Sequence, residues 1–302
     1  MNKTKIDWCD MTWNPVTGCL HGCEYCYAEK IARRFGGWDY SSGHVRMNIA
    51  KDKTYIALDG EVFHNWGCNV YENNGHKVAE LEHPYLIERG CKTTKAPYPF
   101  GFSPTFHRYR LHEPQQVKKP QRIFVVSMGD LFGEWVPDEW IEQVFKACKE
   151  APQHKYLFLT KNPGRYEDIC DGFPEQAHCL YGTTITCQQD IDKIPNNTRP
   201  ILDFLSIEPL LGAVDINGGM KWRREHYSYI PGECVMQPER QSIENHMLQW
   251  VIIGQQTNPD KPPKPEWVQS IIDQCRAANV PVFVKSPLYE RFPIQEWPEG
   301  LK

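Results

Sequence analysis

The chain has 302 residues, enough for one large domain or two small ones, and α/β barrels often fill this range as one domain. A hydrophobic fraction of 40%, a charged fraction of 24% and a formal net charge of −4 are ordinary for a globular protein. These values exclude a disordered chain and give no overall signal of nucleic-acid binding, although they are compatible with a local basic groove.

The amino-terminal residues and the hydropathy predict a soluble, cytoplasmic protein with no membrane partner. Met1–Asp7 lacks the apolar run of a signal peptide, and no window approaches the apolar length of a membrane-spanning helix. The 12 cysteines are therefore expected to be reduced. A disulfide framework is the less favoured alternative, because a chain of this length can build a core without such staples.

The first predicted strand covers residues 12–17 and ends at Gly18, where a cysteine-rich loop begins. The loop has a CxxxCxxC spacing, formed by Cys19, Cys23 and Cys26. A structural zinc site takes four Cys or His ligands and an ordinary [4Fe-4S] cluster takes four thiolates, so three thiolates would leave one iron open to a substrate or cofactor. A zinc knuckle completed by His21 or by a distant residue is the alternative.

The residues after the loop predict an amphipathic helix that ends at Gly36-Gly37. Its apolar positions follow the spacing i, i+3, i+4, i+7, and they are Ala28, Ile31, Ala32 and Phe35. The cysteine loop thus connects a strand to a helix. Such connections form the active face of (β/α) barrels.

Residues 37–121 break this rhythm, and we interpret them as an irregular insertion that covers the barrel mouth. Its cysteines and histidines, such as Cys68, Cys91 and His64, lack metal-ligand spacing, so we expect packing or surface residues rather than a second metal site. The aromatic and basic run Tyr98–Arg110 suits either stacking on a nucleic-acid base or packing of the insertion.

From Arg122 a regular alternation of apolar strands and helices begins. Strands are predicted at 122–127, 155–161, 180–186, 204–209, 250–256 and 280–285, with helices from Pro137-Asp138, after Asn162-Pro163 and around Val268–Cys275. Together with residues 12–17 this gives seven strands and favours a parallel α/β architecture. No GxGxxG follows the first strand, so a partial (β/α) barrel is preferred to an open Rossmann sheet. Residues 1–302 are then one domain, with a second insertion at 212–249 that contains Cys234.

Polar residues gather where the predicted strands end. They are Ser127 and Asp130, Thr160 and Lys161, Thr184 and Thr186, Ser206 and Glu208, Gln255 and Gln256, and Lys285. In one barrel these ends and the cysteine loop would open on the same face. Glu208 is the strongest candidate among them, because a half-buried carboxylate needs a cation or a hydroxyl as its partner.

The cysteine spacing, with aromatic Tyr25 before the last cysteine, resembles the signature of the radical S-adenosylmethionine (SAM) superfamily. Five motifs together resemble the phage and prophage three-Cys-motif family, which is assigned to the radical-SAM-like proteins. The motifs are Asp7–Cys19, Cys23–Glu29, Ser127–Phe132, Leu159–Pro163 and Ser206–Gly212. This resemblance spans nearly the whole chain and implies a partial (β/α) barrel of the radical SAM type.

The resemblance also implies cofactors, partners and roles. Cys19, Cys23 and Cys26 would hold a [4Fe-4S] cluster whose fourth iron binds SAM. SAM would be cleaved to a 5′-deoxyadenosyl radical that abstracts hydrogen from a substrate, for which a nucleic-acid base is the candidate. A flavodoxin or ferredoxin would supply electrons, and a three-Cys-motif partner protein is a further expected partner.

The residues expected to act on SAM or substrate come from several strand ends. The cofactor-binding set is Tyr25, Ser127, Met128, Gly129, Asp130, Thr184, Glu208, Gln255 and Gln256, and the catalytic set is Glu208, Asp130 and Lys161. Many relatives have Gly-Gly-Glu where this chain has Gly254-Gln255-Gln256. That departure motivates the alternative of a metal- or cluster-binding scaffold, or a nucleic-acid-binding protein, without SAM turnover. A zinc hydrolase would need one more ligand at the loop.

Overall fold

The computed structural model describes residues 1–36, 44–48, 53–57, 68–84, 86–89, 92–169, 178–196, 198–217, 221–223, 245–257 and 259–302. Its contacts divide the chain into two compact units, Met1–Leu180 and Tyr181–Lys302, and each is described by itself. The prediction of one domain over residues 1–302 stays a prediction.

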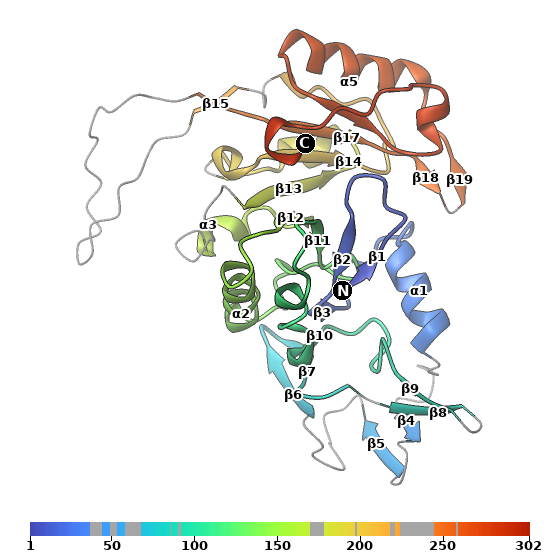
Figure 1. Ribbon diagram of the computed structural model, residues 1–302. Helices are drawn as coiled ribbons and strands as arrows, with labels where there is room; N and C mark the ends of the chain where they lie inside the picture. Colours follow the sequence, from blue (N-terminus) through green and yellow to red (C-terminus); the bar gives the residue numbers. More distant parts are fainter. Residues whose placement is uncertain are drawn as a thin grey trace. The chain divides into compact units, whose positions relative to one another are not determined.

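The first unit contains a mostly parallel sheet, labelled in Figure 1. Its strands, in spatial order, are β1 (Asn2–Lys3), β2 (Met11–Trp13), β11 (Arg122–Val125) and β12 (Lys155–Thr160). β2, β11 and β12 are parallel, and β1 is antiparallel to β2. Ile123, Phe124 and Val125 are all buried, as expected for a parallel strand covered on both faces.

The helices of this unit begin and end close to the predicted positions. They are α1 (Tyr27–Gly36), α2 (Asp138–Lys149) and α3 (Arg165–Ile169). Helix α2 buries Ile141, Val144, Phe145 and Cys148, the positions with helical spacing in the sequence. Cys148 is therefore a core residue, as its position in the apolar stripe predicts.

The predicted strand at residues 12–17 is wrong as a single element. It is interrupted after Trp13, and Val16–Thr17 form a separate strand, β3, in another sheet. Asn14 and Pro15 separate the two strands, and Pro15 has no backbone N–H to donate to a ladder. The cysteine loop thus follows β3 rather than β2.

The segment 37–121 is not irregular throughout. It contains hairpins of β4 (His44–Asn48) with β5 (Lys53–Ala57), β6 (Cys68–Asn73) with β7 (His76–Leu81), and β8 (Leu86–Arg89) with β9 (Lys92–Lys95). Strands β3, β10 (Thr105–His107), β7 and β6 form a second sheet in that order. Asn74 and Gly75 turn the β6–β7 hairpin with positive φ angles of 47° and 75°. Cys91 and His64 lie outside the described residues.

The aromatic run before and within β10 packs inside the first unit. Phe100 is 4% exposed and Phe106 is fully buried, with its ring stacked 5.2 Å from that of Trp140. Arg108 forms an ion pair of 2.7 Å with Glu80. The packing interpretation of this run is confirmed for these residues, and they offer no open platform for a base.

The buried His107 makes the stability of this unit depend on pH. Its two ring nitrogens form hydrogen bonds with Thr17 Oγ1 at 2.9 Å and with Tyr109 Oη at 3.2 Å. Burial holds the pKa of His107 well below its usual value of 6.5. Below about pH 6.5 the unfolded chain therefore binds more protons than the folded chain does. The free energy of unfolding decreases as the pH falls from that value.

We expect the free energy of unfolding to drop by up to about 1.4 kcal/mol per pH unit below pH 6.5 through this residue. Urea titrations of the wild type and of His107→Gln at pH 7 and pH 5 measure the effect. The variant should lose less stability than the wild type between the two pH values, and equal losses would contradict the prediction.

The second unit has a parallel sheet of β13 (Cys179–Ile185), β14 (Phe204–Ile207), β17 (Trp250–Ile253) and β20 (Val282–Val284), with β13 starting two residues before the unit boundary. Its helices are α4 (Gln188–Asp192) and α5 (Pro265–Ala277). Two antiparallel strand pairs consist of β15 (Lys221–Arg223) with β16 (Asn245–Met247), and β18 (Gln256–Thr257) with β19 (Asp260–Lys261). The β15–β16 pair lies in the predicted second insertion, and Cys234 falls outside the described residues.

Short 3₁₀ helices complete the two units at Arg108–Arg110 (η2), Pro114–Gln116 (η3), Arg199–Ile201 (η5), Leu288–Glu290 (η7) and Glu299–Leu301 (η8). The mixed α/β class with mostly parallel strands is confirmed, while the pairings of the described residues close a barrel in neither unit. No disulfide joins the eight cysteines whose side chains the structure describes. No helix among the described residues is long and apolar enough to cross a membrane.

Candidate functional site

The cysteine loop, Gly18–Cys26, is fixed to the end of β11 by a close approach of two glycines. Gly18 N donates to Met128 O at 2.9 Å, and Gly18 forms a parallel bridge with Gly129. A Cβ on Gly129 would lie 2.6 Å from Gly18 O, and one on Gly18 would lie 2.2 Å from Ser103 O. Glycine is required at both positions because a Cβ at either one would clash with a neighbouring backbone oxygen.

The turn after β11, Val126–Asp130, is held in a strained conformation. Val126 has a φ of 59°, which a β-branched residue rarely adopts. Its N–H donates to Trp13 O at 2.7 Å, and Asn14 Oδ1 accepts from Ser127 Oγ at 3.2 Å and Met128 N at 3.0 Å. The residues after β2 therefore impose the shape of this turn.

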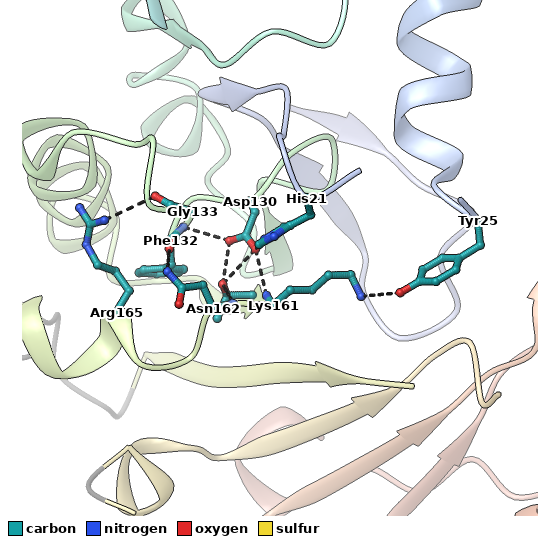
Figure 2. Close-up of polar contacts among 9 residues, drawn as sticks. His21, Tyr25, Asp130, Phe132, Gly133, Lys161, Asn162 and Arg165 are labelled. Carbon is teal, nitrogen blue, oxygen red and sulfur yellow. Dashed lines mark hydrogen bonds and ion pairs between the residues drawn. The ribbon is translucent and has the colours of Figure 1, made fainter. Parts of the chain in front are cut away.

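Asp130 joins the cysteine loop to the ends of β11 and β12, as Figure 2 shows. Its carboxylate accepts from His21 Nε2 at 2.8 Å, Thr160 Oγ1 at 2.8 and 3.0 Å, Lys161 N at 2.9 Å and Phe132 N at 3.0 Å. The side chain is almost completely buried. These donors fill the acceptor capacity of a carboxylate, so Asp130 holds its neighbours in place.

The same contacts decide the ionisation of Asp130. Burial raises the pKa of its carboxyl group, but the hydrogen bond and charge of His21, with the bonds from Lys161 N and Thr160, leave the pKa below its usual value. The group is thus a carboxylate at neutral pH. Its contribution to stability is present above the unfolded pKa of about 3.9 and is lost as pH falls through the lower folded value.

Two tyrosines of the loop and helix α1 also reach these strand ends. Tyr25 Oη accepts from Lys161 Nζ at 3.0 Å, which Figure 2 shows, and Tyr27 Oη donates to Ser127 O at 2.7 Å. Lys161 Nζ also lies 5.2 Å from the centre of the Tyr25 ring. A cationic group is therefore fixed beside the cysteine loop.

The three loop cysteines are unbridged, half-buried thiols close enough to influence one another. Burial raises the pKa of Cys19, and the charges of Asp130, Cys23 and Cys26 raise it further. Burial also raises the pKa of Cys26, although its sulfur accepts a hydrogen bond from Glu29 N at 3.3 Å. Backbone N–H groups pointing at sulfur are among the contacts that tune iron–sulfur ligands.

Three thiols on one loop are a donor set that an iron–sulfur cube with one open iron would take. Among the described residues, no group of three or more His, Cys, Asp or Glu side chains surrounds a point where one ion would sit. In a cube each thiolate binds a different iron, so its ligands surround the cluster without converging on one centre. His21 Nε2 is bonded to Asp130, so a zinc knuckle would have to use the other ring nitrogen, Nδ1.

The predicted residues Thr184, Glu208, Gln255, Gln256 and Lys285 belong to the second unit. Glu208, directly after β14, pairs with Lys285 Nζ at 2.5 Å, and both side chains are mostly buried. A Cβ on Gly254 would lie 2.8 Å from Glu208 Cδ, so glycine at this position leaves room for the carboxylate. Of the two expected kinds of partner, a cation or a hydroxyl, Glu208 has a cation, and its role toward SAM or substrate stays a prediction.

The other predicted residues of this unit have local partners. Gln255 Nε2 donates to Asp260 Oδ1 at 2.5 Å and Gln256 Nε2 donates to Pro259 O at 3.2 Å, both within the β18–β19 region. Thr184 lies within β13, opposite Ser206 of β14. That Thr184, Gln255 and Gln256 bind SAM stays a prediction.

Sequence reasoning missed several residues that build the site of the first unit. Asn14 and Tyr27 were outside the candidate set, Thr160 appeared only as a strand end, and His21 only as a zinc ligand. Asn14 could have been identified from its position between the apolar strand and Pro15, where the strand must end. His21 and Asp130 are 109 residues apart, and no local pattern connects them.

Comparison with known families places the whole chain in one group. A family model described as "Protein of unknown function (DUF5131)" matches residues 3–65 and 66–287. The chain belongs to this family. No curated protein and no solved structure matches the chain. The DUF5131 match covers both the cysteine loop and the turn that holds it, and its description names no activity.

Proposed function

We propose that this protein is a radical SAM enzyme in which Cys19, Cys23 and Cys26 hold a [4Fe-4S] cluster. The observation that carries the proposal is the set of three half-buried thiols on one loop, fixed to the end of a parallel strand through Gly18 and Asp130. When bound, the cluster and SAM would supply a 5′-deoxyadenosyl radical that abstracts a hydrogen atom from the substrate.

The residues around the loop have capacity left for a ligand. Ser127 O and Met128 O each accept one bond from the loop region, and a carbonyl has two lone pairs. They can therefore accept from the ammonium group of SAM. Lys161 uses one of its three donors on Tyr25, so it can also orient a carboxylate or another anionic group.

We also propose a fold, partners and a cellular location for this protein. The parallel strands within each unit support a partial (β/α) barrel of the radical SAM type. A flavodoxin or ferredoxin in the cytoplasm would supply electrons, and a three-Cys-motif partner protein would be a further partner. A nucleic-acid base is the proposed substrate class, and salt-dependent binding to DNA or RNA would support it.

Anaerobic reconstitution of the full chain tests the proposal. The wild type should bind iron and sulfide and release 5′-deoxyadenosine from SAM in the presence of dithionite, and Cys23→Ala should do neither. Cys187→Ala is the matched control, because Cys187 is also a half-buried thiol but lies in the second unit. Binding of zinc alone by the wild type would overturn the proposal. A cluster without any response to SAM would favour the scaffold alternative.

A further inference from the structure

The side chain of Trp135 packs against the middle of the cysteine loop. Trp135 is 3% exposed, and the centre of its ring lies 4.9 Å from that of His21, with the two rings at 75° in an edge contact. His21 lies between Cys19 and Cys23 in the sequence, and its Nε2 is bonded to Asp130 at 2.8 Å, as Figure 2 shows. The His21 ring is therefore held both by a hydrogen bond and by contact with an aromatic ring.

The β6–β7 hairpin in turn fixes the backbone of Trp135. At the tip of the hairpin, Asn73 Nδ2 donates to Trp135 O at 3.1 Å and Asn74 Nδ2 donates to Glu134 O at 2.8 Å. The indole ring lies over Gly133, where a Cβ would come within 2.3 Å of Trp135 Cζ2. The hairpin thus fixes the main chain of Trp135, and the glycine leaves room for its ring.

The indole N–H of Trp135 does not explain why this side chain is placed beside the loop. Nε1 is buried, and among the residues that the structure describes no atom accepts a hydrogen bond from it. A buried donor without an acceptor costs free energy rather than supplying it. The contribution of Trp135 to the site is therefore the contact that its ring makes with His21.

We propose that Trp135 is a positioning residue for the cysteine loop, because its ring holds His21 against Asp130 while the β6–β7 hairpin holds Trp135. His21 then fixes the part of the loop that separates Cys19 from Cys23. That these thiols become iron ligands rests on the proposed function, whereas the contact between Trp135 and His21 belongs to the iron-free chain as well. Ligands that are held in place before iron binds need no reordering when the cluster forms.

Alkylation of the iron-free full chain with iodoacetamide tests this role, because a thiol on a loosened loop reacts faster. Mass spectrometry of the peptides gives the rate at Cys19 relative to that at Cys26, whose sulfur accepts from Glu29 N at the start of α1. Trp135→Leu removes the aromatic contact, so this ratio should rise by about two- to tenfold. Trp135→Phe keeps an aromatic ring and should bring the ratio back toward the wild-type value.

Trp140→Leu is the matched control for the loss of a buried tryptophan. Trp140 is fully buried in the same unit, but its ring stacks on that of Phe106. This variant should keep the wild-type ratio of the two rates, even where its overall stability is lower. Equal ratios in the wild type and Trp135→Leu, or an equal rise in Trp135→Leu and Trp140→Leu, would overturn the inference.

His21→Ala decides whether Trp135 acts through His21. Once His21 is gone, the ring of Trp135 has lost the side chain that it is proposed to hold. The ratio of alkylation rates in His21→Ala/Trp135→Leu should therefore equal the ratio in His21→Ala alone. A further rise in the double variant would show that Trp135 acts by another route and would overturn the inference.

The hairpin offers a second variant that leaves the core intact. Asn73→Ala/Asn74→Gly removes both hydrogen bonds to the backbone at 134–135, and glycine accepts the φ of 47° at position 74. The ratio of alkylation rates should again rise, so the test stands even if Trp135→Leu does not fold. An unchanged ratio in this variant would contradict the role of the hairpin.

Iron retention connects this role to the proposed function. After anaerobic reconstitution, Trp135→Leu should lose iron to a chelator about two- to tenfold faster than Trp140→Leu does. Equal rates of loss would mean that Trp135 does not position the iron ligands. If the wild type binds no cluster, the proposed function fails, and the alkylation rates of the iron-free chain still decide the role of Trp135.

Discussion

Asp130→Ala is expected to reduce the free energy of unfolding by about 3–5 kcal/mol, because it removes the buried acceptor of a charged or polar cluster. His21, Thr160 and the amides of Phe132 and Lys161 would all lose their common partner. The cysteine loop would lose the connection to β12 that runs through His21, Asp130 and Thr160, and would keep the bond between Tyr25 and Lys161. We therefore also expect iron loading after reconstitution to fall. Urea unfolding of the protein without iron and iron analysis after reconstitution measure the two effects.

Asp138→Ala is the matched control for that substitution. Asp138 pairs with Arg165 in the same unit, but its side chain is 64% exposed, so the variant should lose less than about 1 kcal/mol and keep its iron. Asp130→Asn keeps the size of the side chain and one acceptor oxygen, so its loss in the free energy of unfolding should lie between the losses of the other two variants. If Asp130→Ala and Asp138→Ala lost the same free energy of unfolding, Asp130 would not be the acceptor that holds its neighbours in place.

Gly18→Ala is expected to have the second large effect. Its Cβ would lie 2.2 Å from Ser103 O and 2.7 Å from Phe102 O, and the residue has a φ of +87°. The obstacle is the backbone of Phe102 and Ser103, so the loop must move away from that segment. We expect a loss of about 3 kcal/mol or more in the free energy of unfolding, and poor iron loading.

Gly22→Ala separates steric conflict from backbone strain in the same loop. Gly22 has a φ of +66°, but nothing lies within 4 Å of the Cβ that alanine would add. This variant should lose only about 1 kcal/mol, the cost of a left-handed alanine, and should load iron as the wild type does. If both variants showed the same loss, the close approach at Gly18 would not be what holds the loop.

The helices and parallel strands were predictable because their signals are local. The apolar stripe Ile141, Val144 and Phe145 and the apolar run Ile123–Val125 each lie within a few residues of one another, and both are buried as their spacing indicates. The Asn74-Gly75 turn was an equally local signal for a hairpin that sequence reasoning overlooked.

The contacts that build the site were less predictable, because they join distant parts of the chain. The sequence identified Cys19, Asp130 and Lys161 as members of one site, since each follows a predicted strand. It could not show that His21 would bond to Asp130, or that Gly254 would leave room for Glu208. Both depend on how strand ends approach one another, which periodicity does not reveal.

We propose that three thiolates leave one iron of a cluster open to SAM. Electron paramagnetic resonance of the dithionite-reduced, anaerobically reconstituted full chain tests it most directly, with spectra recorded before and after SAM is added. We expect the signal of a reduced [4Fe-4S] cluster that changes when SAM binds and is absent in Cys23→Ala. A reduced-cluster signal that SAM leaves unchanged, or iron retained in full by Cys23→Ala, would contradict it.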